Sequence, residues 1–174
     1  SCVVMGGAPP FKATCEVYDG TSWSTTANLS QARSLLHAAG SSGTSALGAG
    51  GYTGGTTHNP TYENVCTGQT MHAEVVRMEF DPSVVTYDEL LNVLWGCHDP
   101  TTLNRQGPDR GTQYRSAIYF HSPDQAAAAS ASKEKANKSG QFSSTIVTEI
   151  TPAPEYYIAE DYHQKYLEKR GMGS

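Results

Sequence analysis

Glu74 is the residue of this sequence best placed to do acid chemistry. It lies in the segment HAEVVRMEF (72–80), whose β-branched residues between turn signals predict a strand. Period-two alternation puts Glu74 on one face with the apolar residues Val76, Met78 and Phe80. A carboxyl held against an apolar face loses hydration, which raises its pKa and suits it to donate a proton near neutral pH. The alternative is a solvated glutamate at a strand end.

Histidine and cysteine spacing argues against a metal centre. His72 beside Glu74 and His98 beside Asp99 are the pairs most open to a metal hypothesis, but no HExxH or other ligand spacing is present. The cysteines stand far apart without a CxxC pair, so neither a disulfide framework nor a zinc site is expected. They are Cys2, Cys15, Cys66 and Cys97.

Composition excludes several classes of partner. The net charge is -5, and no basic run with interleaved aromatic residues is present, so nucleic acid is not expected as a partner. No apolar run reaches the length of a membrane span, and no charged segment followed by an apolar one opens the chain. We therefore expect a cytoplasmic monomer without membrane contact. A chain of 174 residues suits one domain with a short appendage.

The elements that must position Glu74 alternate without a strict strand–helix rhythm, which predicts an α+β fold. Thr86 and Glu89 form a capping box for a helix that ends near Gly96. Ser122, with a proline after it, begins an alanine-rich helix that ends at Gly140. Strands are expected before Ser122 and in SSTIVTEI, and a final helix follows PAPEYYIAED. The long polar loop TTLNRQGPDRGTQYR (101–115) is of the kind that carries function.

Residues 1–50 differ in amino-acid composition from the rest of the chain. They are rich in Gly, Ser, Thr and Ala, and a Gly-Gly pair at each end brackets short strand candidates at the spacing of one propeller blade. The motifs YDGTSW, NLSQAR and SALGAGGYTG resemble a single kelch-like repeat. One blade cannot bury its own apolar face, so we expect 1–50 not to fold independently, and 51–174 to form a second unit. A flexible linker is the alternative for 1–50.

Residues 51–170, about two thirds of the chain, resemble peptide methionine sulfoxide reductase A. The motifs GYTGG, NPTYENVCTGQT, HAEVVR, DPTTLNRQG, DRGTQYRSAIY and AEDYHQKYL match the family in order and spacing. The resemblance implies a ferredoxin-type α/β sandwich and reduction of methionine sulfoxide in peptides and proteins, a repair reaction under oxidative stress. It implies no bound cofactor, because an external dithiol such as thioredoxin supplies the electrons.

The resemblance also assigns roles to individual residues. Glu74 corresponds to the acid that protonates the sulfoxide oxygen, and Tyr62 and Tyr114 to its hydrogen-bonding partners there. Asp109 corresponds to a residue that supports the site. These types suit the chemistry, because a sulfoxide sulfur becomes electrophilic only when its oxygen is protonated or strongly hydrogen-bonded.

The family's nucleophilic cysteine, in a GCFWG motif, has no match in this sequence. Counting back from GYTGG to its usual place reaches Gln31, so we expect the fold to lack its first strand, its first helix and its thiolate. Cys66 and Cys97 are expected to be buried, inert thiols. Met71 stands where the family commonly has glycine.

Three functions therefore stay open from the sequence. The first is an (S)-methionine sulfoxide reductase on an incomplete framework, whose standing as an enzyme is uncertain. The second is a non-catalytic module that binds methionine sulfoxide. The third is a recombinant structural protein in which the kelch-like part acts and the reductase segment is a passenger.

Overall fold

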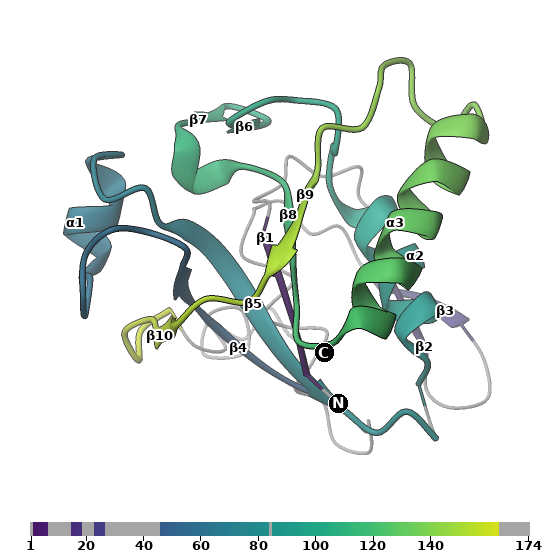
Figure 1. The fold of residues 1–174 in the computed structure, drawn as a ribbon, viewed down its shortest axis with the longest axis horizontal. Coiled ribbons are helices and arrows are strands. Elements are labelled where there is room, and N and C mark those ends of the chain that lie inside the picture. Colours follow the sequence, from purple (N-terminus) through teal and green to yellow (C-terminus); the bar gives the residue numbers. More distant parts are fainter. Residues whose placement is uncertain (1, 7–14, 19–22, 27–45, 84, 164–174) are drawn as a thin grey trace.

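A six-stranded sheet in the order β10-β4-β5-β1-β8-β9 organises the structure (Figure 1). The computed structural model describes residues 2–6, 15–18, 23–26, 46–83 and 85–163, with side chains from residue 50 onward. The strands of these residues are β1 (Cys2–Gly6), β2 (Cys15–Tyr18), β3 (Trp23–Thr26), β4 (Ala46–Thr53), β5 (Ala73–Phe80), β6 (Arg105–Gln106), β7 (Asp109–Arg110), β8 (Ala117–Phe120), β9 (Glu149–Pro152) and β10 (Tyr156–Ile158). Together with the helices they confirm the α+β class.

The pairing of β4 with β5 places the predicted acid. The two strands run antiparallel in a register that sets Tyr52 opposite Glu74. Residues paired across a sheet share a face, so the phenol and the carboxylate lie on the same side. At the other edge β8 and β9 are parallel, and the chain between them passes through a helix, as a parallel pair requires.

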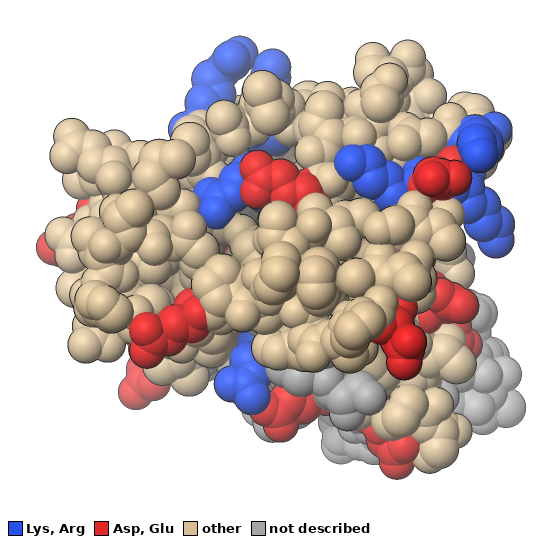
Figure 2. Space-filling view, viewed as in Figure 1, with Lys and Arg blue, Asp and Glu red and all other residues tan. Residues whose placement is uncertain are grey.

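The helices are α1 (Tyr62–Cys66), α2 (Tyr87–Cys97), the 3₁₀ helix η2 (Thr112–Tyr114) and α3 (Pro123–Lys138). The predicted capping box of α2 is confirmed, with Thr86 and Glu89 bonded to each other's backbone. Ser122 caps α3, and Pro123 begins it. Figure 2 shows basic side chains gathered where α3 ends, consistent with the lysines of its last turn, which interact favourably with the helix dipole.

Helices α2 and α3 cover one face of the sheet and form the main core with it (Figure 1). The predicted apolar face of β5 lies in this core, since Val76, Met78 and Phe80 are all buried there. Leu91 and Leu94 of α2 are fully buried against it, and burying a leucine contributes about 2 kcal/mol. Glu74 is therefore the second residue of a strand whose next three residues on that face are buried in the core.

The structure corrects the expectation that the fold lacks its first strand. Strand β1 lies inside the sheet, paired antiparallel with both β5 and β8. Its sequence CVVMG is the short apolar run that a strand inside a sheet requires, and reading residues 1–50 as one loose unit concealed it. Strand β4 also runs without a break through the boundary placed at residue 50. The expected absence of a first helix concerns residues outside the described ones.

The polar loop 101–115 is more ordered than expected. It folds into the β6–β7 hairpin followed by η2, and η2 lies against β5, β6 and β7. Glycine at 111 adopts φ 143°, a conformation that favours glycine, at the turn into η2. The residues before Tyr62 lead into a short helix, and the segment after Pro154 forms β10. The predicted final helix falls largely outside the described residues.

A buried histidine links α2 to the sheet. His98 lies 2.6 Å from the Leu94 carbonyl through Nδ1 and 2.7 Å from the Ser116 hydroxyl through Nε2. Since a carbonyl only accepts, Nδ1 carries the proton and Nε2 accepts from Ser116, whose oxygen lies 2.7 Å from that of Thr148. Burial lowers the pKa of His98 from 6.5 to about 4. The imidazole is therefore neutral in the folded protein at neutral pH.

We expect His98 to make folding sensitive to mild acid. Between pH 6.5 and about 4, His98 is protonated in the unfolded chain but stays neutral in the folded chain. The free energy of unfolding therefore falls as the pH falls. The loss amounts to about 3 kcal/mol. Urea unfolding at pH 7, 5 and 4 should show a shallower decline for His98→Gln than for the parent. The exposed His121→Gln serves as control, and equal declines in all three proteins would contradict the prediction.

Candidate active site

Glu74 lies at the start of β5, at the end of the sheet where α1 and the β6–β7 hairpin lie (Figure 1). Its side chain is partly buried, and its Oε1 atom is wholly buried. The apolar residues that follow it on the same face of the strand, Val76, Met78 and Phe80, are buried in the main core. The expected rise in the pKa of Glu74 stays a prediction.

Tyr114 feels the charge of the other predicted site residues. Burial raises the pKa of Tyr114 to about 12, and the nearby Glu74 adds to the rise, followed by Cys66, Asp109 and Tyr62. All three other predicted residues therefore lie within electrostatic reach of this phenol. A phenol with so high a pKa stays protonated at neutral pH and remains a hydrogen-bond donor.

Helix α1 presents Tyr62 as its first residue. Thr61 and Asn64 form a capping box that begins the helix at this point. The backbone N–H of Tyr62 donates to Oε1 of Glu160 at 2.7 Å, and its ring lies against that of His163, with centroids 4.6 Å apart. The position of Tyr62 therefore depends on a segment almost one hundred residues away in the chain.

Glu160 and Tyr52 are site residues that the sequence analysis missed. The Tyr52 hydroxyl donates to Oε2 of Glu160 at 3.1 Å, so this one carboxylate joins β4 to α1. Burial, followed by the charges of Glu160 and Glu74, raises the pKa of Tyr52. Burial opposes ionisation of Glu160, but its hydrogen bond from the Tyr62 backbone and others hold its pKa below its usual value. Both residues lie in matched motifs, GYTGG and AEDYHQKYL, which was the signal available.

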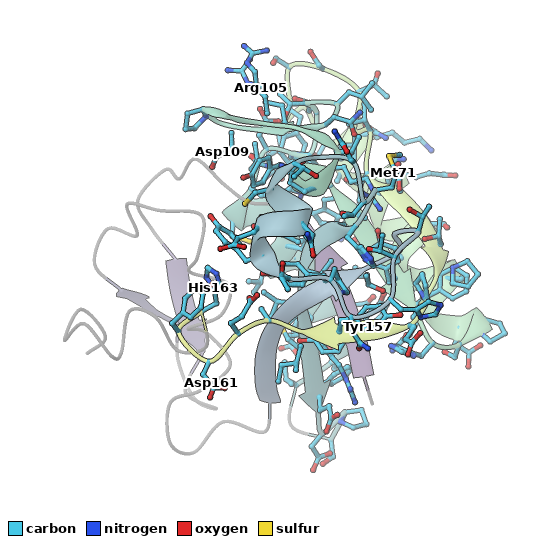
Figure 3. All side chains as sticks on the ribbon, turned by 90° about the vertical axis from the view of Figure 1, so that its left-hand side faces the viewer. Met71, Arg105, Asp109, Tyr157, Asp161 and His163 are labelled. Atoms are coloured by element: carbon cyan, nitrogen blue, oxygen red, sulfur yellow. The ribbon has the colours of Figure 1, made fainter. Side chains whose placement is uncertain are left out.

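Asp109 belongs to the β6–β7 hairpin, where it pairs with Gln106. Figure 3 looks onto this end of the molecule, with Asp109 and His163 in view on either side of helix α1. The carboxylate is partly buried and contributes to the charge felt by Tyr114. The supporting role expected of Asp109 stays a prediction.

The two cysteines whose side chains are described differ in exposure. Cys66, the last residue of α1, is exposed, and it affects the pKa of Tyr114, so it lies near the site. The expectation that Cys66 is buried is therefore wrong, because the short helix ends at the surface. Cys97 is partly buried, and its Sγ lies 3.5 Å from the Leu94 carbonyl.

His72 fixes the loop before α1 to the start of β5. Its buried ring accepts the Gly55 N–H at Nδ1 (3.1 Å) and donates from Nε2 to the Thr57 carbonyl (2.9 Å). A Cβ on Gly55 would approach the ring to 2.2 Å, so the backbone packs directly on it. Both ring nitrogens are thus occupied by the loop. Among the described residues, no group of three or more His, Cys, Asp or Glu is placed to hold a metal ion.

Comparisons with known proteins point to one family. The family described as "Peptide methionine sulfoxide reductase" matches residues 37–174, which begins upstream of the boundary at residue 51. "Peptide methionine sulfoxide reductase MsrA" of Geobacter sulfurreducens is 62% identical over 124 residues, 71% of this chain and 76% of that protein. None of these matches concerns a kelch-like repeat.

Solved structures agree with this result. Reduced Mxr1 from Saccharomyces cerevisiae is 29% identical, with a TM-score of 0.77 over 100% of this chain and 87% of that one. Methionine sulfoxide reductase A of Corynebacterium diphtheriae is 35% identical, with a TM-score of 0.68 over 99% of this chain and 76% of that one. Within the described residues, no helix is both long and apolar enough to cross a membrane.

We expect Met71→Gly to stabilise the protein. Met71 has φ 59°, a left-handed conformation that costs a residue with a Cβ about 1 kcal/mol, and its side chain is 48% exposed, so little packing is lost. The free energy of unfolding in urea should rise by up to about 1 kcal/mol. The exposed Leu103→Gly, at a residue without positive φ, should instead lower it. A loss of stability in Met71→Gly would contradict this account.

Proposed function

We propose that this chain, which belongs to the peptide methionine sulfoxide reductase family, acts on methionine sulfoxide in peptides and proteins. The observation that carries the proposal is the grouping of Glu74, Tyr62 and Asp109 around the raised-pKa phenol of Tyr114. A sulfoxide oxygen needs donors, and protonated phenols beside a carboxyl group supply them.

The chemistry of the acid half follows from these groups. Tyr62 and Tyr114 donate hydrogen bonds to the sulfoxide oxygen, and Glu74 in its protonated form gives that oxygen a proton. Each step withdraws electron density from sulfur and makes it open to attack by a thiolate. The Tyr52–Glu160 pair holds Tyr62 in place, and Asp109 supports Tyr114 from the hairpin.

Reduction needs two thiol equivalents. A thiolate attacks the sulfoxide sulfur, the sulfur–oxygen bond breaks, and the oxygen passes to the thiol as a sulfenic acid while methionine gains two electrons. A second thiol then displaces water and forms a disulfide, which a thioredoxin-like dithiol reduces. The net change converts a sulfoxide and two thiols into methionine, a disulfide and water.

Since the chain has no GCFWG motif, we propose that it retains recognition and polarisation of the sulfoxide without its own efficient nucleophile. A methionine sulfoxide peptide should bind to the unmodified chain, measured by calorimetry. Tyr114→Phe should weaken binding about tenfold, because it removes a donor from a buried oxygen. Glu74→Gln should bind almost as tightly, because proton transfer matters in the transition state. Equal affinity for the sulfoxide and the plain methionine peptide would contradict the proposal.

A second candidate is a working reductase in which Cys66 supplies the thiolate. It is favoured by the exposure of Cys66 and its effect on Tyr114. The two candidates differ in turnover with dithiothreitol. We expect reduction of the sulfoxide peptide near background for the parent and for Cys66→Ser and Cys97→Ser alike. Reduction by the parent that Cys66→Ser abolishes and Cys97→Ser preserves would replace the first candidate with the second.

A further inference from the structure

The guanidinium group of Arg115 joins its own stretch of chain, 112–119, to two remote segments, at Met71 and Glu149. Nη1 donates to the carbonyls of Thr112 (2.8 Å) and Met71 (3.1 Å), and Nη2 donates to the Tyr119 hydroxyl (3.0 Å). Nε lies 3.3 Å from a carboxylate oxygen of Glu149, and the arginine side chain is only 12% exposed. A guanidinium with this many directional bonds has one orientation.

Two of these bonds lead directly to the site. The Met71 carbonyl lies three residues before Glu74, where β5 begins, and the Thr112 carbonyl opens the short helix that ends at Tyr114. Because one nitrogen donates to both carbonyls, the separation between these two backbone segments is set by the reach of a single NH₂ group. Glu74 and Tyr114 each lie close in sequence to a backbone carbonyl that Nη1 of Arg115 binds.

The backbone at Met71 needs such support. Its φ of 59° is unfavourable for a methionine, and conformations of this kind persist only where the surroundings determine them. Arg115 binds its carbonyl. The backbone of Gly54 packs against the guanidinium group, since a Cβ on Gly54 would lie 3.3 Å from Nη2 of Arg115.

We propose that Arg115 is a positioning residue that sets where Tyr114 stands relative to Glu74 through the carbonyls of Met71 and Thr112. It acts through the backbone and does not touch the sulfoxide. The proposal rests on the proposed function, in which the Tyr114 hydroxyl and the Glu74 carboxyl group must both reach one sulfoxide oxygen. Its geometric part does not depend on substrate.

Arg115→Lys tests this role because it loses the planar fork of donors. At the pH of the measurement a lysine of ordinary pKa, about 10.4, is mostly neutral, and losing a positive charge would by itself raise the pKa of Tyr114 rather than lower it. The charges that raise the pKa of Tyr114 come from Glu74, Cys66, Asp109 and Tyr62, so the variant leaves them all in the chain. If Tyr114 moves from its place, its surroundings become more solvated and its pKa falls. In a variant that stays folded, loss of stability alone would leave this pKa unchanged.

The measurement is the ring Cζ shift of Tyr114 in the ¹³C-tyrosine-labelled full chain at pH 11, assigned with Tyr114→Phe and with folding checked by circular dichroism. With a pKa of about 12, roughly a tenth of Tyr114 is ionised in the parent. In Arg115→Lys we expect about half to be ionised, a shift of roughly one unit. Affinity for a methionine sulfoxide peptide should fall about tenfold. Arg77→Lys, a surface arginine of β5, should change neither value.

The proposal is overturned if folded Arg115→Lys has the same Tyr114 ring Cζ shift and the same affinity for the sulfoxide peptide as the parent. If that variant does not fold, Tyr119→Phe and Glu149→Gln each remove one partner of the guanidinium, and both should shift Tyr114 in the same direction by less. If neither variant shifts the Tyr114 signal, the proposal is overturned as well. If Tyr114 shifts but the parent binds no sulfoxide peptide, the positioning role stands and the proposed function fails.

Discussion

The hydroxyl groups around Glu74 remain hydrogen-bond donors because burial beside carboxylates raises their pKa values. Burial is the largest cause for both Tyr114 and Tyr52, and negative charge from Glu74 adds to each. A phenolate next to a carboxylate in a partly dry site would be strongly unfavourable, so the protonated state is secured by position. Tyr52 of β4 and Tyr114 of η2 both lie close enough to Glu74 of β5 for this effect.

Contacts between residues far apart in the sequence bring these phenols and carboxylates close together. Glu160 reaches back to Tyr52 on β4 and to the first turn of α1, and His72 ties the loop before α1 to β5. The main core under α2 and α3 lies elsewhere, so the site draws rigidity from the sheet without being buried in it. At this end of the sheet Cys66 is exposed and Tyr62 is partly buried.

The proposed function draws on one half of sulfoxide chemistry. The residues proposed for the acid half all follow residue 50 and lie in matched motifs. The thiolate half is normally supplied by a motif that this sequence does not contain. Strand β1 nevertheless occupies the interior of the sheet, because a sheet with a missing inner strand would leave the backbone groups of β5 and β8 unpaired.

The sequence by itself determined the features that depend on neighbours within one or two turns. The caps at Thr86 and Ser122 and the buried face of β5 follow from spacing of three residues or of two, and the four predicted site residues from motif matches. Only the tertiary structure decided which segments meet: Glu160 with Tyr52, Arg115 with Met71, and β1 between β5 and β8. Such contacts depend on strand register and on packing between residues tens of positions apart, and local periodicity carries no information about either.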